Sequence, residues 1–198
     1  MKYRLFLFLF LMSLLSQSTL AQSGLNPSSQ QSLNLKFLGS FGLEPGIGAY
    51  HSMLFADAEL GIRLNHSYEI GAYYSSSLNG LYPYGFERTE YLNFFDHGGI
   101  WLGYIFQPEK QVHPFLRIKS GQGNFAIGED MGENYINLAC FVIQPSGGFE
   151  FNINQYLKVS LEIYYRYASS TDIYLYKDDN PGGTGLNLRI TAGIPAGI

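Results

Sequence analysis

The sequence predicts an all-β fold: a single eight-stranded antiparallel up-and-down barrel that spans a membrane. Three observations predict this fold. Apolar and polar residues alternate with a period of two along eight segments, which is the pattern of strands with two different faces. Short and long connections alternate between these segments, as in a meander whose turns and loops lie at opposite ends. The charged residues of the segments share one face, and the other face is continuously apolar.

Composition excludes several other classes of protein. The 198 residues are 46% hydrophobic and 16% aromatic but only 14% charged, well below the roughly 25% of an ordinary soluble domain. A disordered chain would contain few aromatic residues and more charge. The net charge of −4 argues against a nucleic-acid partner, which requires a basic face. A single cysteine, Cys140, excludes a disulfide framework and any metal site built from several cysteines.

Residues 1–21 have the features of a secretory signal peptide. Lys2 and Arg4 precede an apolar stretch at 5–15, and small and polar residues follow up to Ala21, where we expect cleavage. The apolar stretch is shorter than the ~20 residues of a membrane-spanning helix. We expect residues 22–31 to form a flexible periplasmic leader and residues 32–195 to form the barrel.

The strands follow from the alternation. Residues 157–167 give the clearest case, because apolar or aromatic side chains at the odd positions alternate with a mostly polar set at the even positions. A helix would place these apolar residues all around its axis. The predicted strands are 33–43, 54–64, 68–78, 98–106, 112–120, 137–153, 157–167 and 185–194. Short turns are expected at 65–67, 107–111 and 154–155, and long loops at 44–53, 79–97, 121–136 and 170–184.

We expect the charged strand residues to line the barrel interior. This set comprises Lys36, Asp57, Glu59, Arg63, Glu69, Arg117, Lys119, Glu150, Lys158, Glu162, Arg166 and Arg189. Eight strands enclose a space just wide enough for side chains to fill, so these groups can pair there. On the lipid face each cation would cost ~2–4 kcal/mol at mid-bilayer. Tyrosines near the strand ends suit an aromatic girdle at the membrane interface.

A secreted soluble barrel of the lipocalin type is the alternative fold. Such a barrel has an apolar interior and a charged exterior, the reverse of the expected arrangement. It also carries a Gly-x-Trp motif near its first strand, whereas the only tryptophan of this chain is Trp101.

Two segments carry a resemblance to a known group of proteins. Residues 145–167 (PSGGFEFNINQYLKVSLEIYYRY) and residues 103–114 (GYIFQPEKQVHP) resemble hairpins of the small outer-membrane β-barrels of Gram-negative bacteria, particularly the functionally uncharacterised eight-stranded barrels of Bacteroidota. The resemblance covers most of residues 33–194 and implies a location in the bacterial outer membrane after export.

The chain departs from this group at two places. Such barrels commonly end in an aromatic residue that helps the insertion machinery, whereas this chain ends in Ile198. Pro145 falls inside a predicted strand, where its missing N–H costs a ladder hydrogen bond. We expect a β-bulge beside Gly147 and Gly148 to accommodate it.

The residues that could carry catalysis lack the necessary spacing. Some barrels of this kind modify lipid A with a His-x-Ser pair, but His51-Ser52 and His66-Ser67 are adjacent, and neighbours in a strand point to opposite faces. Asp96-His97 is interpreted as a hydrogen-bonded turn at a strand end. We therefore expect no catalytic residues, no metal site and no cofactor. Cys140 is expected to be a buried thiol, and the Gly-rich segment 121–124 lacks the residues of a phosphate loop.

The long loops are acidic and rich in tyrosine. Glu129, Asp130, Asp178 and Asp179 could contact divalent cations that bridge lipopolysaccharide phosphates, although solubility and repulsion between the loops is the favoured explanation. Tyr-rich segments lie at 81–86 and 173–176. They suit protein contacts, because aromatic residues anchor interfaces, and they suit the membrane interface equally. The predicted function is non-enzymatic: a structural barrel or an accessory subunit of a larger outer-membrane assembly. Its partners would be outer-membrane lipid and lipopolysaccharide, with another outer-membrane protein. A narrow porin-like channel and a lipid A-modifying enzyme are the alternatives.

Overall fold

The computed structural model describes residues 34–48, 52–79, 92–128, 136–169 and 182–195. The chain divides into two units, residues 1–32 and residues 33–198, and the second unit contains all the described residues. The predicted signal peptide and leader lie outside the described residues. None of the described residues forms a helix that is long and apolar enough to cross a membrane.

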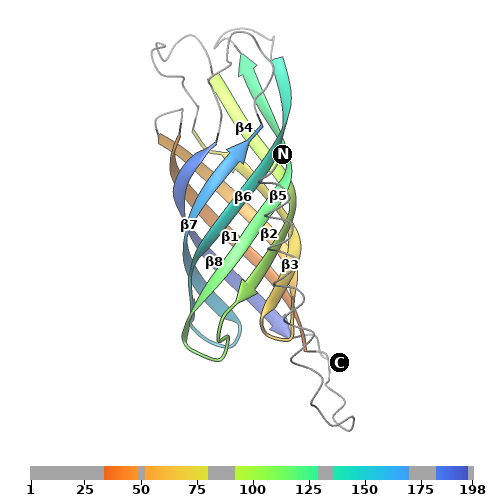
Figure 1. Ribbon diagram of the computed structural model, residues 1–198, viewed down its shortest axis with the longest axis vertical. Helices are drawn as coiled ribbons and strands as arrows, with labels where there is room; N and C mark the ends of the chain where they lie inside the picture. The colour runs from red at the N-terminus through yellow and green to blue at the C-terminus, as the bar shows by residue number, and fades with distance from the viewer. Residues whose placement is uncertain (1–33, 49–51, 80–91, 129–135, 170–181, 196–198) are drawn as a thin grey trace, which may run out of the picture. The chain divides into compact units, whose positions relative to one another are not determined.

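Eight strands form one closed antiparallel sheet, which confirms the predicted fold class. They are β1 (Leu35–Gly48), β2 (Ser52–Leu64), β3 (Tyr68–Ser77), β4 (Leu92–Ile105), β5 (Val112–Gly128), β6 (Ile136–Asn152), β7 (Leu157–Ala168) and β8 (Gly183–Pro195). Each strand pairs with the next one along the chain, and β1 pairs with β8 to close the barrel (Figure 1).

Three short turns lie together at one end of the barrel, which we call the short-turn end. They are the segments 65–67, 106–111 and 153–156 between consecutive strands. Asn65 and His66 have φ values of 48° and 67°, and Ser67 N donates to Leu64 O at 3.3 Å. Two consecutive positive φ values are typical of a type I′ turn, whose twist matches that of an antiparallel hairpin.

The strands extend further toward the opposite end than the sequence predicted. β1 continues to Gly48 and β2 begins at Ser52, so the long loop expected at 44–53 is wrong. Most of the loop expected at 121–136 is also strand, because β5 runs to Gly128 and β6 starts at Ile136. The alternation is blurred in these stretches because most inward positions are occupied by glycine or apolar residues, with Glu44 as the charged exception.

The bulge expected beside Gly147 and Gly148 is absent. Pro145 pairs with Ile118 of β5, and the register between β5 and β6 is constant along the whole length of both strands. On the β7 side, pairing skips Gln144 and Pro145 and resumes in the same register. Pro45 of β1 interrupts pairing with β8 in the same way. The missing proline N–H is therefore accommodated by a local gap in the ladder and not by an inserted residue.

The two faces of the sheet have opposite chemistry. Leu60 and Ile163 are 73% and 67% exposed on the exterior, whereas Lys119 and Arg189 are 1% and 0% exposed inside. This arrangement excludes the lipocalin-type alternative, which requires an apolar interior throughout. The strands contain 10–17 residues, and ~9–11 tilted residues cross a hydrocarbon core. Each strand is long enough to span a bilayer.

Candidate functional site: the barrel interior

The structure brings the charged residues predicted for the interior into one buried network. Eleven of the twelve are almost completely buried, and Lys36 is partly exposed at the short-turn end. The buried residues are Asp57, Glu59, Arg63, Glu69, Arg117, Lys119, Glu150, Lys158, Glu162, Arg166 and Arg189. They come from six of the eight strands, so the network links most of the barrel wall.

Glu59 of β2 is the centre of the network. Its carboxylate accepts hydrogen bonds from Arg117 Nη1 at 2.9 Å and from Arg189 Nη1 at 2.9 Å. Lys119 Nζ lies 3.1 Å from Oε1 of the same carboxylate, and Ser40 Oγ donates to Oε2 at 3.0 Å. Three cations from two strands, β5 and β8, therefore converge on one carboxylate.

The ion pairs form successive layers along the barrel axis, which we call tiers, and the group around Glu59 is the central one. Glu44 of β1 is the centre of a second tier, which lies farther from the short-turn end. It accepts hydrogen bonds from Lys119 Nζ at 2.9 Å and from Asn187 Nδ2 at 3.0 Å, and it also pairs with Arg166. Arg166 Nε in turn donates to Gln144 Oε1 at 2.8 Å. The sequence placed Glu44 among the acidic loop residues, and this placement is wrong because β1 extends past it.

Glu162 of β7 connects these two tiers. It accepts a hydrogen bond from Asn187 Nδ2 at 2.8 Å and pairs with Arg189. Ser146 Oγ donates to its other oxygen at 2.9 Å. Because Asn187 donates to both Glu44 and Glu162, a neutral amide bridges two carboxylates without adding charge.

A third tier lies at the short-turn end. The Glu150 carboxylate accepts hydrogen bonds from Arg63 Nη2 at 3.0 Å, from His113 Nε2 at 3.0 Å and from Lys158 Nζ at 2.5 Å. Glu69 accepts from Arg63 Nε at 2.8 Å and from Arg117 Nη2 at 2.8 Å, which joins this tier to the central one. Buried charges that were left unpaired would destabilise the fold strongly, so this reciprocal pairing is a condition of having a charged interior.

Trp101 of β4 packs on a platform of two glycines. A Cβ atom at Gly61 or Gly71 would lie only 2.7 Å from the Trp101 ring, so the indole lies directly against the backbone at both positions. The Arg117 guanidinium lies over the Trp101 ring, 4.3 Å from its centroid. Trp101 thus combines close backbone packing with a cation–π contact, which is strongest when it is desolvated.

An apolar tier fills the interior at the end opposite the short turns, and the sequence interpretation missed it. Phe55 packs edge-on against Phe95 with the ring centroids 6.0 Å apart, and Phe95 contacts Phe125 at 6.3 Å. The Arg166 guanidinium lies 4.0 Å from the Phe55 ring centroid and joins this tier to the charged one. These phenylalanines occupy the inward positions of their strands, a signal that was present in the alternation once the strands were extended.

His97 lies within this apolar tier, and the turn expected at Asp96-His97 is wrong. Both residues belong to β4 and pair with Ser76 and Ser75 of β3. His97 is 1% exposed, and its Nδ1 is 3.3 Å from Tyr73 Oη. Asp96 accepts a hydrogen bond from Ser76 Oγ at 2.5 Å. As neighbours in a strand they point to opposite faces, so they do not form a catalytic dyad.

The described histidines and the cysteine do not form a reaction centre. His66 is exposed in a turn, and His113 is held between Glu150 and the Lys110 carbonyl. Cys140 is a buried free thiol. No group of three or more His, Cys, Asp or Glu side chains suited to a metal ion occurs among the described residues. His51 and the acidic loop residues Glu129, Asp130, Asp178 and Asp179 lie outside the described residues, as do the two Tyr-rich segments.

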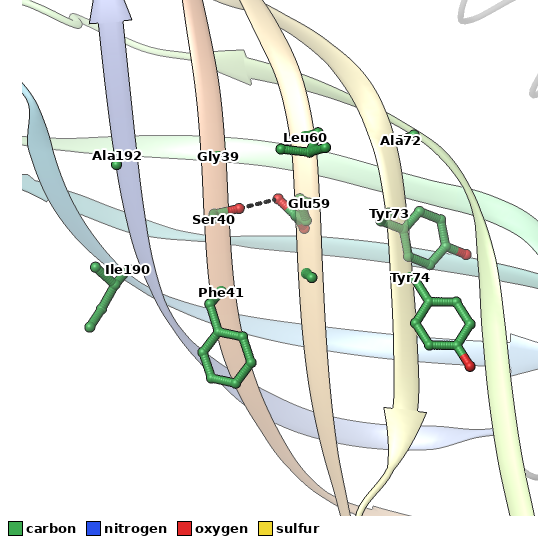
Figure 2. A pocket seen from close by; sticks show the side chains of 11 residues that line it. Gly39, Ser40, Phe41, Glu59, Leu60, Ala72, Tyr73, Tyr74, Ile190 and Ala192 are labelled. Carbon is green, nitrogen blue, oxygen red and sulfur yellow. Dashed lines mark hydrogen bonds between the residues drawn. The ribbon is translucent and has the colours of Figure 1, made fainter.

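The apolar exterior is hollowed where four strands present small side chains. A groove of about 820 Å³ crosses β8, β1, β2 and β3. Its floor is formed by Gly39, Ala58, Ala72 and Ala192. Figure 2 shows Phe41, Tyr74 and Ile190 around it, with the inward Ser40–Glu59 hydrogen bond behind the same wall. The groove lies on the apolar face, and Ser40, Glu59 and Tyr73 of the same wall also line it.

Solved structures of three bacterial proteins have a similar fold. They are the Neisserial surface protein A (12% identity, 83% of this chain and 97% of that chain, TM-score 0.51), the N-terminal β-barrel domain of Pseudomonas aeruginosa OprF (10%, 81% and 98%, TM-score 0.53) and Ail, the attachment invasion locus protein of Yersinia pestis, in complex with the heparin analogue sucrose octasulfate (12%, 82% and 99%, TM-score 0.51). No protein-family model and no curated protein sequence matches the chain. At these identities the likeness concerns the fold alone, and the chain has the closed eight-stranded antiparallel fold of outer-membrane barrels.

Proposed function

We propose that this protein is a non-enzymatic, non-conducting barrel of the bacterial outer membrane whose interior network is structural. The observation that carries this proposal is the succession of ion-paired and aromatic side chains along the interior. Ion-paired tiers centred on Glu150, Glu59 and Glu44 are followed by the aromatic tier around Phe95. A barrel of eight strands has room for side chains but not for an additional aqueous channel.

The apolar exterior and the resemblance of residues 145–167 to Bacteroidota barrels support the location in the outer membrane. In this orientation the short turns face the periplasm and the longer connections face outward, as in bacterial barrels generally. The proposed partners are therefore outer-membrane lipid and lipopolysaccharide. Export through the signal peptide at 1–21 belongs to the same proposal, and cell fractionation with N-terminal sequencing of the mature chain tests it.

Planar-bilayer recording tests the closed interior. The wild-type protein is expected to insert without steady conductance. A variant with the aromatic tier truncated, Phe55→Ala combined with Phe95→Ala, serves as the comparison because it removes two of the largest fully buried side chains and leaves the ion pairs in place. Steady single-channel currents from the wild-type protein would establish the porin-like alternative instead.

Mass spectrometry of lipid A after expression tests the enzymatic alternative, and an unchanged lipid A profile is expected.

The exterior groove favours a second candidate, an accessory subunit of a larger outer-membrane assembly. Small residues let backbones approach closely within a membrane, and the groove presents Ala58 and Ala72 at its floor. A photo-crosslinking residue at Ala58 is expected to give a discrete adduct with another outer-membrane protein in native membranes. The same residue at Phe141, on β6 at the opposite wall of the barrel, is the matched control. Equal adducts at both positions, or none at Ala58, would favour the solitary structural barrel.

A further inference from the structure

The interior opens at the short-turn end into a cavity of about 260 Å³ that is lined by basic side chains. Lys36 of β1, Arg63 of β2 and Lys158 of β7 line it, together with residues of all three short turns. The remaining lining residues are Asn34, His66, Pro108, Asn152, Asn154 and Gln155, and none of them is acidic. Positive charge and neutral polar groups thus surround the cavity.

The cations of this cavity exceed the carboxylates that are available to them. Lys158 and Arg63 share Glu150. Arg63 also uses Glu69, but Glu69 is simultaneously paired with Arg117. Lys36 donates to the backbone carbonyl of Gln155 at 2.6 Å, and no carboxylate among the described residues lies within ion-pair distance of it. The local charge balance at this end is positive.

Unused hydrogen-bond donors accompany the excess charge. An ammonium group has three N–H donors. The described contacts account for one donor at Lys36, to Gln155, and for one at Lys158, to Glu150. Each lysine therefore has two further donors beside the cavity. An anion with several oxygens around one centre can accept from cations that approach from different strands, which a two-oxygen carboxylate does less well.

We propose that this cavity binds one phosphate group, either as free phosphate or as the head of a phosphorylated small molecule such as a glycerol phosphate. Lys36 of β1 and Lys158 of β7 donate to it from the two strands that flank β8. Arg63 contributes positive charge from β2. The cavity of about 260 Å³ has room for a phosphate with a short substituent. This ligand would be taken up from the side of the membrane that the short turns face.

Calorimetric titration of the refolded barrel in a phosphate-free maltoside detergent tests the proposal. Sodium phosphate and glycerol 1-phosphate are titrated separately at constant ionic strength. Saturable binding of one phosphate per chain is expected. The stronger of the two ligands identifies the source, because glycerol 1-phosphate also represents a lipid headgroup. Absence of saturable heat with both ligands would overturn the proposal.

Two lysines at the same end of the barrel provide matched variants. Lys36→Gln removes a cation that has no carboxylate partner in the part of the chain that the structure describes, and it is expected to weaken phosphate binding by about tenfold or more. Lys110→Gln removes an exposed turn lysine that does not line the cavity, and it is expected to leave binding unchanged. Equal weakening by both variants would mean general electrostatic screening and would contradict a site.

A footprinting experiment on the wild-type protein makes the test independent of variant folding. Lysines are acylated with and without saturating phosphate, and the modified positions are identified by mass spectrometry. Phosphate is expected to protect Lys36, which is partly exposed, but not the exposed Lys110. Acylation of Lys36 that is unaffected by phosphate would refute the site, whatever the Lys36→Gln variant shows.

Discussion

The Lys119 ammonium group donates to the Glu44 carboxylate at 2.9 Å across the barrel interior. Lys119 belongs to β5 and Glu44 to β1, and these strands are four positions apart in the ring of eight. They are therefore on opposite walls. This ion pair spans the interior and couples two strands that share no backbone hydrogen bonds.

Replacement of Lys119 by methionine should destabilise the barrel severely. The ammonium group lies within 3.1 Å of carboxylate oxygens of Glu44, Asp57 and Glu59, so its removal leaves three buried anions with less compensation. Removing one partner of a buried ion pair costs about 3–5 kcal/mol. Urea unfolding in lipid vesicles, followed by Trp101 fluorescence, measures the loss.

A matched lysine and a double variant separate charge pairing from general effects of the substitution. Lys110→Met, in an exposed turn, should change the free energy of unfolding by less than about 0.5 kcal/mol. Adding Asp57→Asn to Lys119→Met should recover part of the loss, because Lys119 is the only ion-pair partner of Asp57 among the described residues and its removal leaves that anion uncompensated. Additive losses in the double variant would show that the pair does not contribute as the geometry indicates.

Gly71 should tolerate no side chain, because Trp101 and the neighbouring strand occupy the space. A Cβ atom there would lie 2.1 Å from Leu60 O and 2.7 Å from Trp101 Nε1. Gly71→Val is therefore expected to cost about 1–3 kcal/mol through overpacking and to shift the emission maximum of the single tryptophan.

Gly39 supplies the control for this substitution. A Cβ atom at Gly39 would meet only a Leu60 methyl group at 3.7 Å, an ordinary contact. Gly39→Ala should therefore leave the Trp101 spectrum and the unfolding midpoint nearly unchanged. If Gly71→Val behaved like Gly39→Ala, the packing of Trp101 on its glycine platform would be disproved.

The sequence predicted the architecture well because successive residues of a strand point to opposite faces, and in a membrane barrel these two faces differ in polarity. Lys158, Glu162 and Arg166 of β7 lie on the inward face, and Leu161 and Ile163 lie on the exposed face, as the alternation indicates. The pattern is strong because each face has one environment along nearly the whole strand.

The prediction failed where the interior itself changes chemistry. Toward the end opposite the short turns the inward residues become Phe55, Phe95 and Phe125, so both faces are apolar and the alternation vanishes. Glu44 was assigned to the loop expected at 44–53, a stretch that contains two glycines. The bulge expected at Pro145 was wrong for a related reason, since a closed ladder tolerates a local gap that pattern reasoning does not reveal.

Cys140 should be protected from alkylation in the folded barrel. Its side chain is buried in the interior on β6, 6% exposed, and a thiol that cannot be reached does not react. N-ethylmaleimide in detergent is expected to leave Cys140 unmodified over hours and to label it after unfolding. A variant that carries Cys140→Ser and Ile153→Cys moves the thiol to the turn between β6 and β7, where the wild-type side chain is 60% exposed, and it should react in the folded state.

Leu188 should reject a charge if the exterior contacts hydrocarbon. It lies near the middle of β8 with its side chain 53% exposed on the apolar face, so Leu188→Arg places a cation at mid-bilayer depth. The expected loss in the free energy of unfolding from lipid vesicles is about 2–4 kcal/mol.

Ile153→Arg is the matched control, because Ile153 is equally apolar but lies in the turn between β6 and β7, where the loss should be about 0–1 kcal/mol. Equal losses at the two depths would mean that the apolar face is not immersed in a bilayer. The depth dependence distinguishes a lipid-facing surface from a surface that is covered by another protein. On a protein-covered surface the loss in the free energy of unfolding would depend on the local contacts of the arginine and not on its distance from the membrane midplane.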